Sequence, residues 1–261
     1  MKTLTEIANY YGTDKGSSGH NYTQFYEQYF EVERNRFINL LEIGIDNGAS
    51  LSMWEEYFPN ARIDAFDIMD LKKFQKDRVN IHIGDQGNRN ELNSIIKNIN
   101  VTPNIIIDDG SHFADDQQIS LGVLFDFLAP GGIYVIEDVF PLVLTSAVLL
   151  TSRRENISVP PNVSNKYYVG PGFSEKNFVP ILLSSGIRSR SPKIDYSRGF
   201  PGVKGHKVST LDILVNFCFN GIIDSPVMTD SEIKYLNKNI DFINIHQSSI
   251  HDLLICFIGK K

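Results

Sequence analysis

The sequence predicts an α/β fold in which helices cover both faces of a mainly parallel, doubly wound sheet. From Phe37 onward, short β-rich runs alternate with helical patterns, and turn residues such as Pro59-Asn60 separate them. Two further β-rich runs lie close together near the end of the chain. This pattern is typical of a Rossmann-like, seven-stranded sheet.

Five predicted strands belong to the alternating part of the chain: Phe37–Ile43, Ala61–Asp67, Val79–Gly84, Asn104–Asp108 and Gly132–Glu137. The helices predicted between them, bounded by turn residues, are Ala49–Phe58, Asn90–Asn98 and Asp115–Leu128. Two later helices are predicted at Leu211–Phe219 and Ser231–Asn239. The last β-rich runs, Asp241–His246 and Leu253–Ile258, are so close that they predict an antiparallel hairpin at the sheet edge.

The 261 residues predict one domain, residues 1–261, with two distinctive segments. Residues 140–208, rich in Pro and Gly, form an insertion after the fifth strand that we expect to shape an acceptor site. Residues 1–36 form a tyrosine-rich helical segment. This segment either lies over the carboxyl ends of the strands as a lid or packs as helices onto the sheet.

Composition argues against several classes of protein. With 25 Lys and Arg against 31 Asp and Glu, the net charge is −6, and no basic stretch carries interleaved aromatics, so a nucleic-acid partner is not expected. The N-terminus lacks a signal-peptide pattern, and the longest apolar stretch, Val139–Leu150, is too short to span a bilayer. We expect a cytoplasmic protein with no membrane partner. Cys218 and Cys256 are expected to be packed in the core.

A glycine-containing turn follows the first predicted strand. It has an acidic residue, one spacer and then two glycines separated by three residues: Glu42, Gly44 and Gly48. Glycines let the backbone approach a ligand, and the next helix offers free N–H groups. The spacing differs from the G-x-G-x-x-G of dinucleotide sites and favours adenosylmethionine over NAD. A tight structural turn is the alternative.

Two later strand ends carry polar residues suited to the rest of such a cofactor. Asp67 ends the second strand, where a carboxylate can accept both ribose hydroxyl protons. Asp64, nearer the middle, is expected to face solvent at a sheet edge. Asp85 and Gln86 follow the third strand, where they either meet the adenine or form an Asx turn.

Carboxylates gather at the ends of the fourth and fifth strands. Asp108, Asp109 and His112 follow the fourth, and Glu137 and Asp138 the fifth. So much negative charge repels itself unless a cation lies within it, and oxygen ligands favour Mg²⁺, then Mn²⁺ or Ca²⁺. The alternative is that these residues cap helices without a metal.

His112 is placed to act as a general base, since a neutral imidazole can take the proton of a metal-bound hydroxyl. The other histidines lack comparable acidic neighbours in the sequence and are expected to be packed or at the surface: His20, His82, His206, His246 and His251.

Several motifs in one order, YGTDKG, HNY, YE, LEIGIDNGASLSMW, GDQ, IIIDDGSH and YVIEDV, resemble the bacterial macrolide-glycoside and sugar O-methyltransferases. The resemblance runs to about Val139 and includes the closing hairpin, whereas Phe140–Val208 does not align. It implies the class I methyltransferase fold with adenosylmethionine and Mg²⁺ (or Mn²⁺) as cofactors. We expect no separate assembly domain before Met1. The sequence leaves open whether the chain forms a homo-oligomer.

The resemblance also implies roles for individual residues. His112 would be the base, and the metal ligands would be Asp109, Glu137 and Asp138. The cofactor would be held by Glu42, Gly44, Gly48, Asp67, Asp85 and Gln86, with Asp108 beside its methionine end. The residues that would close over the site are Asp14, Lys15, His20 and Tyr22.

The acceptor implied is a hydroxyl of a sugar: a nucleotide sugar, a surface-glycan unit of polysaccharide biosynthesis or a natural-product glycoside. Neighbouring hydroxyls on one substrate could both reach the metal. A catechol would chelate equally well and is the main alternative. A metal-dependent hydrolase or phosphotransferase would leave the glycine turn and Asp67 without a role. A non-catalytic cofactor-binding module would leave His112 unexplained.

Overall fold

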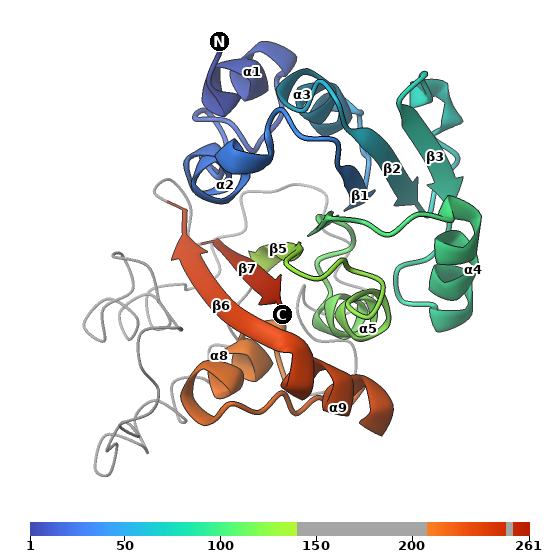
Figure 1. The fold of residues 1–261 in the computed structure, drawn as a ribbon, viewed down its shortest axis with the longest axis vertical. Coiled ribbons are helices and arrows are strands. Elements are labelled where there is room, and N and C mark those ends of the chain that lie inside the picture. Colours follow the sequence, from blue (N-terminus) through green and yellow to red (C-terminus); the bar gives the residue numbers. More distant parts are fainter. Residues whose placement is uncertain (140–207, 249–252) are drawn as a thin grey trace, which may run out of the picture.

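A computed structural model describes residues 1–139, 208–248 and 253–261. The predicted insertion therefore lies outside the described residues, apart from Val208. The described chain forms one sheet with helices on both sides (Figure 1).

The sheet has seven strands in the order β3-β2-β1-β4-β5-β7-β6. The strands are β1 Asn39–Ile43, β2 Arg62–Asp67, β3 Val79–Ile83, β4 Ile105–Asp108, β5 Ile133–Val139, β6 Ile240–Gln247 and β7 Leu254–Lys260. Strands β1 to β5 pair in parallel, whereas β7 runs antiparallel to both β5 and β6. The predicted doubly wound sheet with a closing hairpin is confirmed.

Two sets of helices cover the two faces, and a hydrophobic core fills the space between each set and the sheet. Helices α1 Leu4–Tyr11, α2 Thr23–Phe30 and α3 Ala49–Tyr57 pack on one face. The other face is covered by α4 Arg89–Ile99, α5 Ala114–Leu124, α8 Thr210–Asn220 and α9 Asp230–Asn239. Consecutive residues of β1 are buried on opposite faces of the sheet, since Leu40 belongs to one core and Leu41 to the other.

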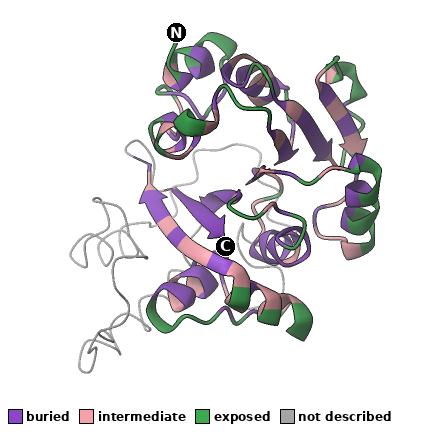
Figure 2. Cartoon of the chain, in the orientation of Figure 1, coloured by how far each residue is buried: buried purple, intermediate pink, exposed green. Residues whose placement is uncertain are grey.

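The N-terminal segment is part of the core. Helix α1 begins with a capping box between Thr3 and Glu6. In α2, Tyr26 is buried, with its ring 5.1 Å from that of Trp54 and 5.5 Å from that of Phe257. Figure 2 shows the central strands of the sheet mostly in the colour of buried residues. The helices thus pack onto the sheet face, and the segment also reaches the carboxyl ends of the strands through Lys15 and Tyr22, so both arrangements considered for it are present in part.

One prediction about the sheet is wrong. Asp64 was expected to face solvent, yet it is 1% exposed. Its strand, β2, lies between β1 and β3, so no edge is available there. The carboxylate is paired instead with the Arg62 guanidinium at 2.8 Å and with His82 Nε2 at 2.9 Å. Buried charges need such partners, and those partners come from the same strand and the next one.

Helix α5 ends at Leu124, earlier than the predicted Leu128. The carbonyl groups of Phe125, Asp126 and Leu128 all accept hydrogen bonds from Lys260 Nζ, at 3.1, 2.9 and 2.6 Å. The last strand thus supplies a cation where the helix leaves its carbonyls without partners.

We expect Lys260→Met to lower the free energy of unfolding by roughly 2 to 3 kcal/mol, because three carbonyl groups lose a charged donor. Urea unfolding measures the change. The control is Lys261→Met, whose ammonium bonds one exposed carbonyl, that of Lys238. Equal effects of the two substitutions would show that the buried contacts of Lys260 add nothing.

Both cysteines, Cys218 and Cys256, are buried and free, as predicted. Burial raises the pKa of the Cys218 thiol to about 12. Within the described ranges, no helix has the length and apolar character needed to cross a membrane.

Candidate active site

The turn after β1 forms the floor of the site. Gly44 has φ +88°, and a Cβ there would lie 2.1 Å from the carbonyl oxygen of Asp109. Only glycine allows the β1 and β4 loops to approach this closely. Gly48, also at positive φ, leads directly into α3. This close approach joins the glycine turn to the acidic loop, and the predicted approach of the turn to a ligand stays a prediction.

A cavity of about 790 Å³ opens above this floor. The loops that follow β1, β2, β3 and β4 line it, and the segment Gly12–Lys15 closes one side. Ligands of doubly wound sheets bind at this carboxyl end of the strands. The volume falls in the range typical of small-molecule and cofactor sites.

The residues predicted to hold the cofactor divide into two groups. Those lining the cavity are Gly44, Asp67, Asp85 and Gln86. Glu42, Gly48 and Asp108 are not among the lining residues. Glu42 is fully buried behind the turn, where it accepts hydrogen bonds from Ser50 Oγ at 3.2 Å and Trp54 Nε1 at 3.1 Å. Burial raises the pKa of Glu42 to about 7.

Asp67 is oriented by the backbone. One carboxylate oxygen accepts the N–H of Ile45 at 3.0 Å, and the other accepts the N–H of Met69 at 2.9 Å. Each oxygen keeps further acceptor capacity toward the cavity. Asp85 accepts the N–H of Gly87 at 2.8 Å, which is the Asx turn considered as an alternative, although Asp85 also lines the cavity.

Gln86 and Asp108 form a buried hydrogen-bond network behind the cavity wall. Gln86 Nε2 donates to Asp108 at 2.6 Å, and Gln86 Oε1 accepts the N–H of Ser111 at 2.8 Å. Asp108 also accepts from Ser120 Oγ and from Tyr134 Oη. Burial raises the pKa of Asp108 to about 6. These contacts fix the loop that carries Asp109 to His112.

A bulge in β5 brings two consecutive carboxylates to the site. Between Ile136 and Val139 the pairing with β7 shifts by one residue, and Asp138 adopts φ +51°. Consecutive residues of a regular strand point to opposite faces, whereas a bulge redirects one of them. Glu137 and Asp138 can therefore both face the carboxyl end of β4.

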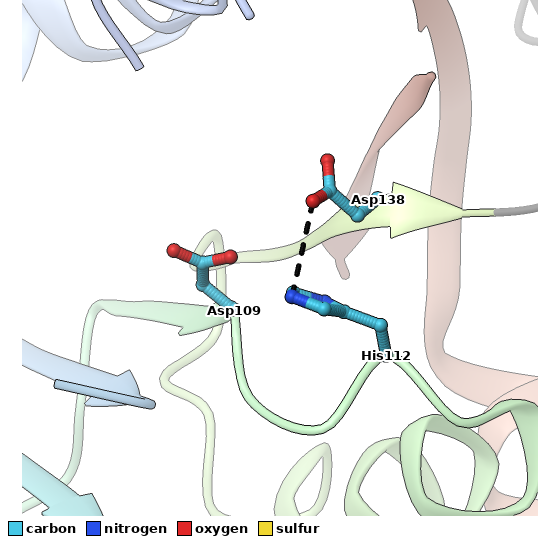
Figure 3. A group of neighbouring side chains, drawn as sticks. All are labelled: Asp109, His112 and Asp138. Atoms are coloured by element: carbon cyan, nitrogen blue, oxygen red, sulfur yellow. Dashed lines mark ion pairs between the residues drawn. The ribbon is translucent and has the colours of Figure 1, made fainter. Parts of the chain in front are cut away.

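Asp109, His112 and Asp138 offer ligand atoms within 4.8 Å of one another (Figure 3). His112 Nε2 lies 3.8 Å from Asp138 Oδ2, too far for a hydrogen bond. His112 Nδ1 is buried and has no hydrogen-bond partner among the described residues. The carboxylate oxygens of Asp109 and Asp138 are the donors that a hard divalent cation such as Mg²⁺ or Mn²⁺ prefers, so these two residues fit the expected metal.

Four N-terminal side chains reach the three carboxylates predicted as metal ligands. Lys15 Nζ donates to Asp109 and Glu137, and Tyr26 Oη donates to Glu137. Tyr22 Oη donates to Asp138 at 2.7 Å, and His20 Nδ1 lies 3.5 Å from the same carboxylate. Asp14, by contrast, lies at the cavity wall.

Sequence reasoning missed part of this arrangement. It placed Lys15, His20 and Tyr22 over the site as a closing segment, without their bonds to the acidic side chains. His20 appeared to have no acidic neighbour, because Asp138 is more than a hundred residues away in the chain. The only available signal was the spacing of Tyr22 and Tyr26, which puts two hydroxyls on one side of a helix.

Comparison with known proteins finds sequence similarity to bacterial O-methyltransferases. It is 35% identical over 222 residues to demethylmacrocin O-methyltransferase of Streptomyces fradiae, covering 76% of this chain and 55% of that protein. It is 35% identical over 144 residues to mycinamicin VI 2''-O-methyltransferase of Micromonospora griseorubida, covering 52% and 36%. The chain thus spans about half or less of the length of these relatives. No family model matches it.

The solved structure of the MycE methyltransferase from the mycinamycin biosynthetic pathway, in complex with Mg, SAH and mycinamycin VI, superposes with a TM-score of 0.63. The match has 23% identity and covers 100% of this chain and 55% of that one. It supports the fold expected from the sequence. The chain is therefore related to the bacterial macrolide-glycoside and sugar O-methyltransferases and has the class I methyltransferase fold.

Proposed function

We propose that the chain is an adenosylmethionine- and divalent-metal-dependent O-methyltransferase that acts on a sugar hydroxyl of a small molecule. The observation that carries this proposal is the junction of two features at Asp109. Its backbone packs against the cofactor-type turn at Gly44, and its side chain belongs to the cluster with His112 and Asp138. A methyl donor in the cavity and a hydroxyl at the cluster would be neighbours.

Each group of residues has its own proposed role. Gly44, Asp67 and Asp85 line the cavity that would take adenosylmethionine. Asp109 and Asp138, with Glu137 close by, would hold Mg²⁺ or Mn²⁺. When bound, the ion lowers the pKa of a coordinated hydroxyl, and adenosylmethionine provides an activated methyl group. His112 takes the proton that the hydroxyl releases.

The sugar acceptor is supported by the relatives, several of which are named for O-methylation of sugar units on macrolides or tetracenomycin. It also fits the chemistry, because vicinal hydroxyls give the ion two oxygens from one substrate. His20 and Tyr22, at the edge of the carboxylate cluster, are the side chains we propose to meet the acceptor. Residues 1–36 and 140–208 are proposed to shape its pocket.

Calorimetric titration of adenosylmethionine, with and without Mg²⁺, tests the proposal. We expect binding in the micromolar range and methylation of glycoside acceptors only when Mg²⁺ is present. In Asp109→Ala the Mg²⁺ response is expected to vanish, because one carboxylate ligand is lost. Lys97→Met, at an exposed lysine of α4 outside the cavity lining, is the matched control.

Other results would redirect the proposal. Activity on catechols alone would overturn the sugar acceptor. Metal-dependent hydrolysis without adenosylmethionine binding would replace the methyltransferase by a hydrolase.

A further inference from the structure

Lys15 is a fully buried cation at the centre of the candidate site. Its Nζ donates to Asp109 and, at 3.0 Å, to Glu137. Burial disfavours the ammonium, but Asp109 and Glu137 outweigh this effect and raise the pKa of Lys15 well above its usual range. Both partners of this buried side chain are thus carboxylates predicted to hold the metal.

The same residue ends one wall of the cavity. Gly12, Thr13, Asp14 and Lys15 all line it, as does Gly44. This wall is short and joins α1 to the segment before α2. The side-chain bonds of Lys15 connect the wall to the loop after β4 and to β5. Whatever holds Lys15 therefore also holds the wall in place.

Charge balance shows what Lys15 does in the absence of a metal. Lys15 is paired with Asp109 and Glu137, whereas Tyr22 and His20 lie against Asp138. A divalent ion held by these carboxylates would supply positive charge to the same two partners of Lys15. A buried carboxylate without a counter-charge costs several kcal/mol. In the metal-free protein, the ammonium of Lys15 is the counter-charge of Asp109 and Glu137 and lowers this cost.

We propose that Lys15 is a positioning residue that keeps the Gly12–Lys15 wall seated in the metal-free protein, so that adenosylmethionine-type ligands bind whether or not metal is present. This inference rests on the proposed function. Without Lys15, the facing carboxylates repel one another and the wall loses its attachment. A divalent ion then supplies the missing charge, and ligand affinity becomes dependent on metal.

The test is titration of S-adenosylhomocysteine into each variant with Mg²⁺ and with a chelator. For the wild type we expect dissociation constants within about twofold of each other under the two conditions. For Lys15→Met we expect binding at least about tenfold tighter with Mg²⁺. Lys97→Met, which removes an exposed lysine of α4 that does not line the cavity, should behave as the wild type.

A second variant separates charge from packing. Lys15→Arg keeps the positive charge on a different side chain, so the Mg²⁺ dependence should fall back toward the wild-type ratio. A persistent tenfold dependence in the folded Lys15→Arg variant would overturn the argument from charge. Circular dichroism of each variant confirms that the chain is folded.

The remaining outcomes are equally decisive. If Lys15→Met binds S-adenosylhomocysteine equally well in both conditions, Lys15 does not hold the wall and the inference fails. If the wild type itself needs Mg²⁺ to bind, the inference fails without any variant. If no protein binds S-adenosylhomocysteine in either condition, the proposed function fails, and the inference with it.

Discussion

His112→Ala is expected to lower the rate of methyl transfer by about 10²- to 10⁴-fold, the usual contribution of a general base. The cavity should still bind adenosylmethionine, because the residues that would hold it belong to the β1, β2 and β3 loops. Single-turnover kinetics at saturating cofactor would measure the chemical step, and calorimetry would measure binding.

The same variant separates two roles for His112. If His112 is the base, the metal is held by Asp109, Asp138 and Glu137, and Mg²⁺ binding does not need His112. If His112 is a ligand, it holds the metal together with Asp109 and Asp138. Unchanged Mg²⁺ affinity with a slow chemical step supports the base. A parallel loss of Mg²⁺ affinity would make His112 a ligand and contradict that role.

His82→Ala is the matched control for this experiment. His82 is also a partly buried histidine beside an aspartate, but its neighbour, at 2.9 Å, is Asp64 on β2. Asp64 keeps its pairing with Arg62 in this variant. Turnover close to the wild-type value is therefore expected. A comparable fall in rate would indicate that any lost histidine disturbs the fold, and the argument for His112 would fail.

The fold could be predicted because its signals are local. The alternation of apolar runs with helical patterns places β1 to β5, and the short separation of β6 and β7 predicts their hairpin. The observed end of a helix differs from the predicted end where residues distant in the sequence contact it. Helix α5 stops before Leu128 because Lys260, far along the chain, binds the carbonyls that follow it. Nothing in the sequence of α5 carries that information.

The site could be predicted only as far as strand ends determine it. Parallel strands deliver their carboxyl-terminal residues to one edge, which is why Asp67, Asp109 and Asp138 were found from spacing. The bulge at Asp138 and the pairing of Lys15 with two carboxylates depend on contacts between remote segments. Asp64 shows the opposite case, since its pairing with Arg62 and His82 hides a charge that sequence alone placed in water.

Gly44→Ala is expected to be among the most damaging small substitutions in the molecule. An added methyl at φ +88° would meet the Asp109 carbonyl oxygen at 2.1 Å, and this atom belongs to the backbone. The left-handed conformation alone costs about 1 to 2 kcal/mol for an L-residue. Displacing the β4 loop adds to this cost, for a total of roughly 3 kcal/mol or more. Urea unfolding measures it.

Gly131→Ala isolates the contribution of the close approach. Gly131 has nearly the same conformation, with φ +74°, but a Cβ there meets nothing within 4 Å. In this control the free energy of unfolding should fall by only about 1 kcal/mol, the cost of the left-handed backbone conformation for a residue with a side chain. Because the added methyl at Gly44 must push Asp109, Mg²⁺ affinity should also fall in Gly44→Ala and stay unchanged in Gly131→Ala. Equal losses of stability with unchanged Mg²⁺ affinity in both variants would mean that the glycine turn serves the chain only as a turn, and that its contact with the acidic loop has no part in the site.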